Sequence, residues 1–219
     1  MKLYNFHRSS ASYRVRIALA LKGCAVDLVT VNLRRGDQVS RDYLHVAPAG
    51  LVPLLEDGEG TVAQSLAIIQ YLDDRYGAPR LIPEDPREKA CAWQLALTIC
   101  CDIHPLNNLR VLRFLEIKLG LSESQRQRWY EHWVKLGLGA FEELLDRANR
   151  GGPFCLGEQL TLADICLVPQ VANARRFKVS LERFPRVLAI DAHCRSLPAF
   201  QAAAVPASDD PAATDGAAL

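Results

Sequence analysis

Short apolar runs alternate with helix-spaced apolar positions over residues 1–80. Strand-like runs cover residues 2–5, 26–31, 54–56 and 61–63. Helical spacing, with apolar residues three or four positions apart, covers residues 10–22, 40–46 and 65–75. The predicted order is therefore β-α-β followed by α-β-β-α. Because a right-handed crossover places the first two strands side by side, this order predicts one four-stranded mixed sheet.

From residue 87 onward, every predicted element is a helix. Two long amphipathic segments, 87–119 and 123–150, form the spine of a bundle, and Pro105 is expected to kink the first of them. A third helix begins at Thr161, where Asp164 completes a capping box. Shorter helices are expected over residues 185–195 and 198–204.

The pattern divides the chain into two domains. Residues 1–80 are expected to form an α/β domain with the thioredoxin-like strand order, and residues 87–205 an all-α helical bundle. Prolines break the helical pattern between them, so residues 81–86 are expected to be a linker. The tail, residues 206–219, is rich in Ala, Asp and Pro without an apolar period, and is expected to be disordered.

Composition narrows the range of partners. The 219 residues are 49% hydrophobic and 23% charged, with a formal net charge of +1 and no long basic run, so neither nucleic acid nor a membrane is an expected partner. No signal core or spanning apolar stretch is present, which indicates a cytoplasmic protein. The seven cysteines form no C-x-x-C pair or zinc spacing, and we expect reduced thiols and no metal site.

A hydroxyl-rich segment, residues 8–16, lies between the first predicted strand and the first predicted helix. Ser9 or Ser10 is the expected N-cap of that helix. A helix N-terminus carries about half a positive charge and several unpaired N–H donors. A serine there either only caps the helix or also helps to hold an anion or a thiolate, and the residues alone leave both interpretations open.

Five segments resemble the cytosolic glutathione transferases, and the zeta class in particular. The resemblance covers residues 1–204 and includes the order of an α/β domain followed by a helical domain. The matching segments are residues 8–19 (RSSASYRVRIAL), 51–53 (LVP), 64–65 (QS), 102–110 (DIHPLNNLR) and 168–177 (VPQVANARRF). The resemblance therefore implies the glutathione transferase architecture and glutathione as the cofactor.

The same resemblance implies which residues hold glutathione. Ser9 would stabilise the thiolate, with Ser10 as the alternative catalytic hydroxyl. The Val52 backbone, before a cis Pro53, would face the tripeptide, and Gln38 would reach its glycyl end. The full implied set is Ser9, Ser10, Arg14, Gln38, Val52, Gln64, Ser65, His104, Asn108 and Arg110. Without the resemblance, Pro53 would be expected to be trans, Gln38 to be a solvated loop residue and Ser65 to be a plain helix cap.

One hydroxyl at a helix N-terminus is enough to activate the thiol. Lowering a thiol pKa of about 8.5 by about two units requires about 2.7 kcal/mol of preference for the charged form. A hydrogen bond to a charged group contributes about 1.5–3 kcal/mol and a helix N-terminus about 0.3–2 kcal/mol. No general base is therefore required.

Arginines supply the expected substrate contacts. Guanidinium groups bind carboxylates bidentately, and the resemblance implies that Arg8, Arg110 and Arg176 face one cleft and hold a dicarboxylate. His104 and Asn108, four positions apart on a predicted helix face, would donate hydrogen bonds to glutathione or to the reacting substrate. The alternatives are ordinary surface arginines and a structural histidine.

The resemblance implies a glutathione-dependent cis–trans isomerase acting on maleylacetoacetate, in a homodimer. Maleylpyruvate remains open as the substrate, as does conjugation of small electrophiles by a general transferase. A binding module without catalysis is the third alternative. Ala11 stands where zeta-class members often carry cysteine, which favours isomerisation over reductive dehalogenation. We expect Cys91, Cys100, Cys101 and Cys166 to be buried and inert rather than to replace that thiol.

Overall fold

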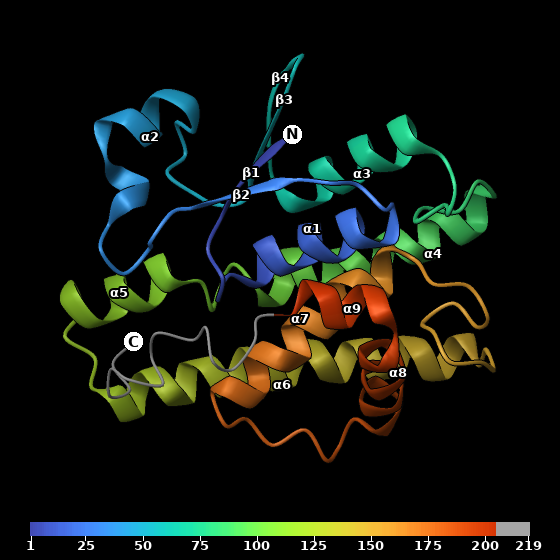
Figure 1. Ribbon diagram of the computed structural model, residues 1–219. Coiled ribbons are helices and arrows are strands. Elements are labelled where there is room, and N and C mark those ends of the chain that lie inside the picture. Colours follow the sequence, from blue (N-terminus) through green and yellow to red (C-terminus); the bar gives the residue numbers. More distant parts are fainter. Residues whose placement is uncertain (205–219) are drawn as a thin grey trace. The chain divides into compact units, whose positions relative to one another are not determined.

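The computed structural model describes residues 1–204, and the predicted disordered tail, 206–219, lies outside them. Two compact units are present (Figure 1). One comprises Met1–Leu81 together with the segment that starts at Leu197, and the other comprises Ile82–Ser196. Within the described residues, no helix is both long and apolar enough to cross a membrane.

The first unit contains the predicted mixed sheet. Its strands are β1 (Lys2–Asn5), β2 (Asp27–Thr30), β3 (Leu54–Asp57) and β4 (Gly60–Ala63), in the order β2-β1-β3-β4. Strand β1 pairs in parallel with β2 and antiparallel with β3, and β3 and β4 form a hairpin. The β-α-β crossover thus places β1 and β2 side by side, and the thioredoxin-like fold prediction is confirmed.

Four α-helices and one short 3-10 turn complete the described part of this unit. They are α1 (Ser10–Leu21), the turn Asp37–Val39, α2 (Arg41–Val46), α3 (Ser65–Tyr76) and α9 (Pro198–Ala203). Helix α1 packs against both α3 and α9. The Tyr13 hydroxyl donates to the Phe200 carbonyl at 3.3 Å, and Arg16 Nε donates to the Ala203 carbonyl at 2.9 Å. These contacts join α9 to the first unit, whereas the predicted boundary places residues 198–204 in the helical domain.

A buried ion pair ties the ends of α1 and α3 together. Lys22 Nζ lies 2.7 Å from Asp73 Oδ1, and both side chains are at most 1% exposed. Lys22 also donates to the Pro79 carbonyl at 2.7 Å, and the Leu81 amide donates to Asp73 Oδ1 at 2.8 Å. Because both charges are paired and hydrogen-bonded, their burial is tolerated. The pair fixes the segment by which the chain leaves the α/β unit.

The second unit is helical, as predicted. It contains α4 (Pro86–Leu97), a π-helical segment (Thr98–Ile103), α5 (Leu109–Ile117), α6 (Glu123–Ala148), α7 (Leu162–Arg176) and α8 (Pro185–Ser196). The capping box predicted at Thr161 and Asp164 is present, and Ser122 and Gln125 form a second one at the start of α6. Helix α7 is buried along most of its length and forms the centre of this unit's core.

The single helix predicted over residues 87–119 is wrong. The π-helical segment follows α4, and its last bond runs from the His104 amide to the Ile99 carbonyl at 2.9 Å. A turn then contains Pro105, which lacks the N–H needed to continue the ladder. Asn108 adopts an extended conformation and caps a new helix, α5. Proline therefore ended the helix, where sequence analysis predicted only a kink.

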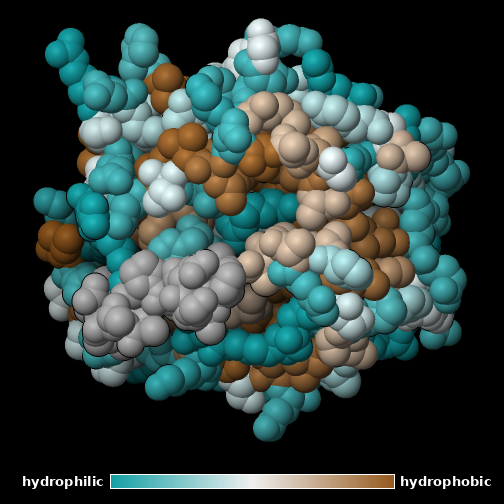
Figure 2. Space-filling view, in the orientation of Figure 1, coloured by the Kyte–Doolittle hydropathy of each residue, from teal (hydrophilic) through white to brown (hydrophobic). Residues whose placement is uncertain are grey.

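Helix α5 exposes much of its apolar surface. Phe114, Ile117 and Leu119, at and just beyond its C-terminal half, are 55%, 69% and 58% exposed. Figure 2 shows hydrophobic residues at the edge of the molecule where Figure 1 places α5. Its other face is buried through Leu112 and Leu115.

Two glycines inside α6 provide a paired test of packing. A Cβ at Gly137 would overlap the Ile103 side chain, whereas a Cβ at Gly139 would lie 3.9 Å from Phe184 Cε1. Gly137→Ala should lower the free energy of unfolding by about 1–3 kcal/mol through overpacking. Gly139→Ala should leave it unchanged or raise it by up to about 1 kcal/mol through helix propensity. Urea unfolding of both variants checks the contrast, and equal effects would contradict the packing of α6 on the π-helical segment.

Candidate functional site

Ser9 is the N-cap of α1. Its backbone is extended, with φ −73° and ψ 118°, and its Oγ accepts a hydrogen bond from the Ser12 amide at 3.2 Å. A hydroxyl can accept and donate at the same time, and no bond between described residues uses the Ser9 O–H as a donor. Ser10, in contrast, is buried and already has an interaction partner. Ser9 is therefore a capping residue whose O–H donates to no other described residue.

A buried arginine lies beside the N-terminus of α3. Arg14 is 2% exposed, and its Nη1 donates to Ser65 Oγ at 3.2 Å. Its Nε and Nη2 have no hydrogen-bond partner among the described residues. A buried guanidinium without a carboxylate is costly, and the N-terminus of α3 adds further positive charge. This corner is therefore suited to an anionic group supplied from outside the chain.

Gln64 holds a strained backbone next to that corner. Its φ of 72° lies in the left-handed region, which costs a non-glycine residue about 1–3 kcal/mol. Its carbonyl accepts from the Ile68 amide at 3.0 Å and so starts α3, while its side chain is exposed. Such strain persists where the surrounding structure requires it, and it concentrates at binding sites.

The turn before β3 presents an open stretch of backbone. The Val52–Pro53 peptide bond is cis, as the family resemblance implied. No hydrogen bond between described residues engages the N–H or C=O of Val52, although the residue is only 9% exposed. Backbone groups of this kind are suited to pairing with a peptide.

Gln38 lies next to the same turn. A Cβ added at Gly50 would come within 3.0 Å of the Gln38 carbonyl oxygen, so the two backbones approach closely. The Gln38 side-chain Oε1 is buried and has no partner among the described residues. Gln38 is therefore half-buried, with its backbone near Gly50, and is not a fully solvated loop residue.

Tyr43 packs against the turn that contains Val52 and Pro53. It packs in a cluster with Phe6 and Val52, and its hydroxyl donates to the Leu51 carbonyl at 2.7 Å. Burial raises the pKa of Tyr43 to about 12.

Tyr43→Phe should lower the free energy of unfolding by about 1 kcal/mol at pH 7, because the Leu51 carbonyl loses its donor. The pH dependence of the free energy of unfolding should also change. An unfolded tyrosine ionises near pH 10, so the contribution of Tyr43 to the free energy of unfolding is complete below pH 10 and is lost as the pH rises through about 12. Denaturant unfolding between pH 9 and pH 12 measures how steeply the free energy of unfolding changes with pH. The exposed Tyr76, changed to phenylalanine, is the control, and an unchanged slope in Tyr43→Phe would contradict this role.

The remaining predicted residues of the second unit lie at two helix ends. Asn108 Oδ1 accepts from the Arg110 amide at 3.1 Å, so Asn108 caps α5 and does not share a helix face with His104 as predicted. The Asn108 amide NH₂ remains a possible donor, His104 is half-buried, and Arg110 is exposed. Arg8, in the first unit, is half-buried.

Arg176 ends α7, with an exposed side chain held in place by two neighbours. Its Nη2 donates to Asn173 Oδ1, and its guanidinium lies 5.2 Å from the centre of the Phe177 ring. Phe177 in turn stacks on Tyr130 at 4.0 Å. The preceding residue, Arg175, has a different partner, Asp191 Oδ2, at 2.6 Å. Sequence reasoning identified Arg176 but not the two residues that orient it.

The cysteines follow the expectation in part. Cys166 is buried, Cys91 and Cys100 are half-buried, and Cys101 is exposed, which corrects its expected burial. None of the seven forms a disulfide, and the described residues contain no group of three or more metal-ligating side chains.

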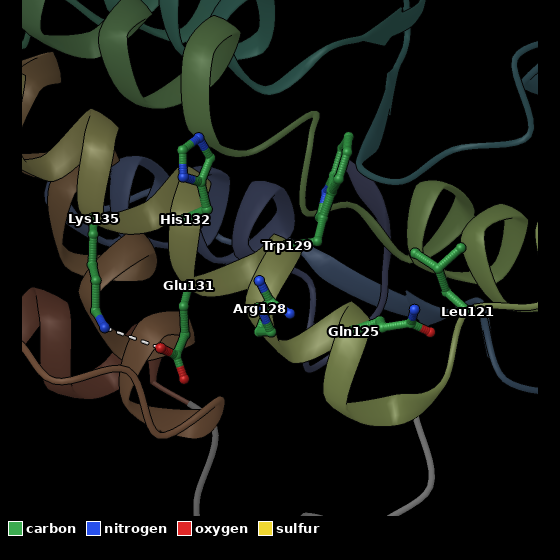
Figure 3. Close-up of a pocket in the computed structure, with 7 residues that line it drawn as sticks. All are labelled: Leu121, Gln125, Arg128, Trp129, Glu131, His132 and Lys135. Carbon is green, nitrogen blue, oxygen red and sulfur yellow. Dashed lines mark hydrogen bonds and ion pairs between the residues drawn. The ribbon is translucent and has the colours of Figure 1, made fainter.

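A separate open hollow of about 510 Å³ runs along α6 (Figure 3). Its lining is Leu121, Gln125, Arg128, Trp129, Glu131, His132 and Lys135. Glu131 and Lys135 point toward one another and pair at 3.0 Å. The hollow contains none of the predicted site residues and neither a hydroxyl nor a thiol, so it does not replace the site built around Ser9 and Arg14.

Comparison with protein families gives two matches. The model described as the glutathione S-transferase N-terminal domain matches residues 3–80, and that of the C-terminal domain matches residues 127–190.

Individual proteins match over nearly the whole chain. A probable maleylacetoacetate isomerase of Vibrio cholerae serotype O1 is 48% identical, over 92% of this chain and 94% of its own. A holo maleylpyruvate isomerase, described as a bacterial glutathione S-transferase in the zeta class, superposes with a TM-score of 0.93 at 41% identity, covering 96% of this chain and 99% of its own. A maleylacetoacetate isomerase from Methylobacterium extorquens AM1, with bound malonate and glutathione, gives 0.90 at 37% identity and covers 93% and 95%.

Proposed function

The chain belongs to the glutathione S-transferase family, in its zeta class, and from that premise we propose that it is a glutathione-dependent cis–trans isomerase with maleylacetoacetate as its leading substrate. The observation that carries the proposal is the buried, carboxylate-free Arg14 beside Ser65, in the same unit as the available Ser9 hydroxyl. A peptide thiol with a free carboxylate requires an anion site for its carboxylate and a hydrogen-bond donor for its thiolate. A relative that binds glutathione supports the same interpretation.

Each end of glutathione has a proposed partner in the first unit. The γ-glutamyl carboxylate would bind at Arg14, Gln64 and Ser65, where the guanidinium and the α3 N-terminus both favour negative charge. The Val52 backbone would face the tripeptide, and Gln38 would bind the glycyl end. The Ser9 O–H would donate to the thiolate, with Ser10 as the alternative.

The proposed substrate contacts are arginines. Arg8, Arg110 and Arg176 would hold the carboxylates of the substrate, and His104 and Asn108 would donate hydrogen bonds to glutathione or to the substrate. The bound malonate in the Methylobacterium relative, itself a dicarboxylate, supports a site that accepts two carboxylates. Asn173 and Phe177 orient Arg176, which reduces the side-chain entropy that binding would otherwise cost.

Glutathione, when bound, supplies a thiolate that adds reversibly to the cis double bond conjugated to a ketone and leaves after rotation about the resulting single bond. Ser9 stabilises the thiolate before addition and again on release, so a single hydroxyl serves both directions. The arginines hold the carboxylate ends of the substrate during rotation. His104 and Asn108 donate toward the ketone oxygen, where negative charge develops.

The test is an assay of purified protein with maleylacetoacetate and with maleylpyruvate, each with and without glutathione. We expect isomerisation that requires glutathione and leaves its total concentration unchanged. Consumption of one glutathione per turnover would instead support a conjugating transferase. Glutathione binding without turnover of either substrate or of a reactive haloacid would support a binding module.

A homodimer in the cytoplasm completes the proposal. Light scattering at micromolar concentration should give a mass of about twice the chain's 24.3 kDa, and a monomer mass would contradict it. Use of glutathione and an odd number of cysteines, none in a disulfide among the described residues, suit a reducing compartment.

A further inference from the structure

Two cysteines from different helices bring their sulfur atoms into contact in the second unit. Cys100 lies in the π-helical segment and Cys166 in α7, and their Sγ atoms are 3.7 Å apart. Cys100 is half-buried, and Cys166 is 0% exposed. The π-helical segment packs directly on α7. The pair is outside the residues proposed to bind glutathione or substrate.

We propose that Cys100 and Cys166 are a redox-sensitive pair that closes to a reversible disulfide cross-link between the π-helical segment and α7. A disulfide needs its sulfurs about 2.05 Å apart, so these two sulfurs would have to approach from van der Waals contact as the bond forms. The site would respond to a small peroxide, because a half-buried thiol admits hydrogen peroxide more readily than a bulky disulfide.

The chemistry balances with hydrogen peroxide as the only oxidant. The Cys100 thiolate attacks one peroxide oxygen, the O–O bond breaks, and Cys100 becomes a sulfenic acid while hydroxide leaves and takes up a proton as water. Cys166 sulfur then attacks the Cys100 sulfur, the S–O bond breaks, and a second water leaves. Two thiols and one peroxide thus give one disulfide and two waters. A thiol reductant such as glutathione restores both thiols by exchange.

Other cysteines differ from this pair in their burial. Cys101 follows Cys100 but is exposed. Cys155 and Cys194 are both buried, and burial raises the pKa of each thiol well above its usual range, which keeps them protonated and unreactive. Cys101 is therefore the matched control, since it is adjacent in sequence and more accessible than Cys100.

The test oxidises the full chain with hydrogen peroxide and follows its intact mass. We expect a loss of about two mass units as two hydrogens leave. Non-reducing trypsin digestion should join the peptide of residues 90–110 to that of residues 151–175. Cys100→Ala and Cys166→Ala should each abolish the cross-link, and Cys101→Ala should retain it. Circular dichroism of each reduced variant checks that the variants fold.

A thermal readout tests that the bond lies inside the folded unit. Cross-linking positions 66 residues apart restricts the unfolded chain, so oxidised protein should melt about 5 °C or more above reduced protein, and dithiothreitol should reverse the shift. A cross-link that survives in Cys100→Ala, a bond that requires Cys101, or oxygen addition without a cross-link would each overturn the proposal. None of these outcomes depends on isomerase activity, so the inference stands or falls separately from the proposed function.

Discussion

Ser9→Ala should lower turnover of maleylacetoacetate by about 10- to 1,000-fold, while glutathione affinity changes by no more than a few-fold. The hydroxyl would interact mainly with the thiolate, and the tripeptide would keep its contacts at Arg14, Gln38, Val52 and Ser65. Removing one hydrogen bond to a charged group therefore changes the fraction of reactive thiolate more than it changes binding. We therefore expect kcat to fall while the Kd for glutathione stays within a few-fold of its original value.

The matched control is Ser10→Ala. Ser10 is next in sequence but buried and already engaged, so its removal should leave the thiolate unaffected. Ser9→Thr should restore activity, because threonine keeps both the hydroxyl and the ability to cap α1. The thiol pKa, followed by thiolate absorbance of bound glutathione against pH, should rise in Ser9→Ala alone. A raised pKa in Ser10→Ala instead would assign the catalytic hydroxyl to Ser10.

Loss of the cap is a separate effect that the same variant introduces. Ser9 Oγ accepts from the Ser12 amide, so alanine there should also cost about 1 kcal/mol of stability. Melting curves measure this cost directly. A drop in turnover at a temperature where both proteins are fully folded then reports only on the thiolate.

The fold was predictable because its signals are local. Short apolar runs predict the strands, and the β-α-β crossover rule predicts that β1 and β2 are adjacent in the sheet. The break after Ile103 escaped prediction because apolar residues continue at helical spacing on both sides of Pro105. Periodicity alone does not distinguish a kink from a complete stop, so it predicts Asn108 on a continuous helix, whereas Asn108 caps α5.

The candidate site was predictable only as a set of residue types. The family resemblance implies Ser9 with Ser10 as the alternative, and the Ser12 amide bond to Ser9 and the burial of Ser10 support that order. The burial of Arg14 depends on how α1 packs against α3, which is a long-range property. The positive φ of Gln64 has no signal in a single sequence, because glutamine rarely adopts that conformation.

Arg176→Ala should lower kcat/KM for maleylacetoacetate about 30- to 1,000-fold. This corresponds to a loss of about 2–4 kcal/mol of transition-state stabilisation. The bound substrate would cover the exposed Arg176 side chain, so removal of the guanidinium would leave a covered carboxylate without its partner. Turnover of a neutral electrophile such as chlorodinitrobenzene should hardly change, since it has no carboxylate to hold. Asn173→Ala should show the same selectivity with a smaller loss, because Asn173 only orients the guanidinium.

Arg175→Ala is the matched control for Arg176→Ala. The two arginines are neighbours at the same helix end, but Arg175 pairs with the buried Asp191. Its removal should therefore lower the melting temperature and reduce both activities in proportion to the folded fraction. Equal losses on the two substrates in Arg176→Ala would make Arg176 a structural residue like Arg175. A selective loss would favour the isomerase over a general transferase, because conjugation of a neutral electrophile requires no carboxylate-binding arginine.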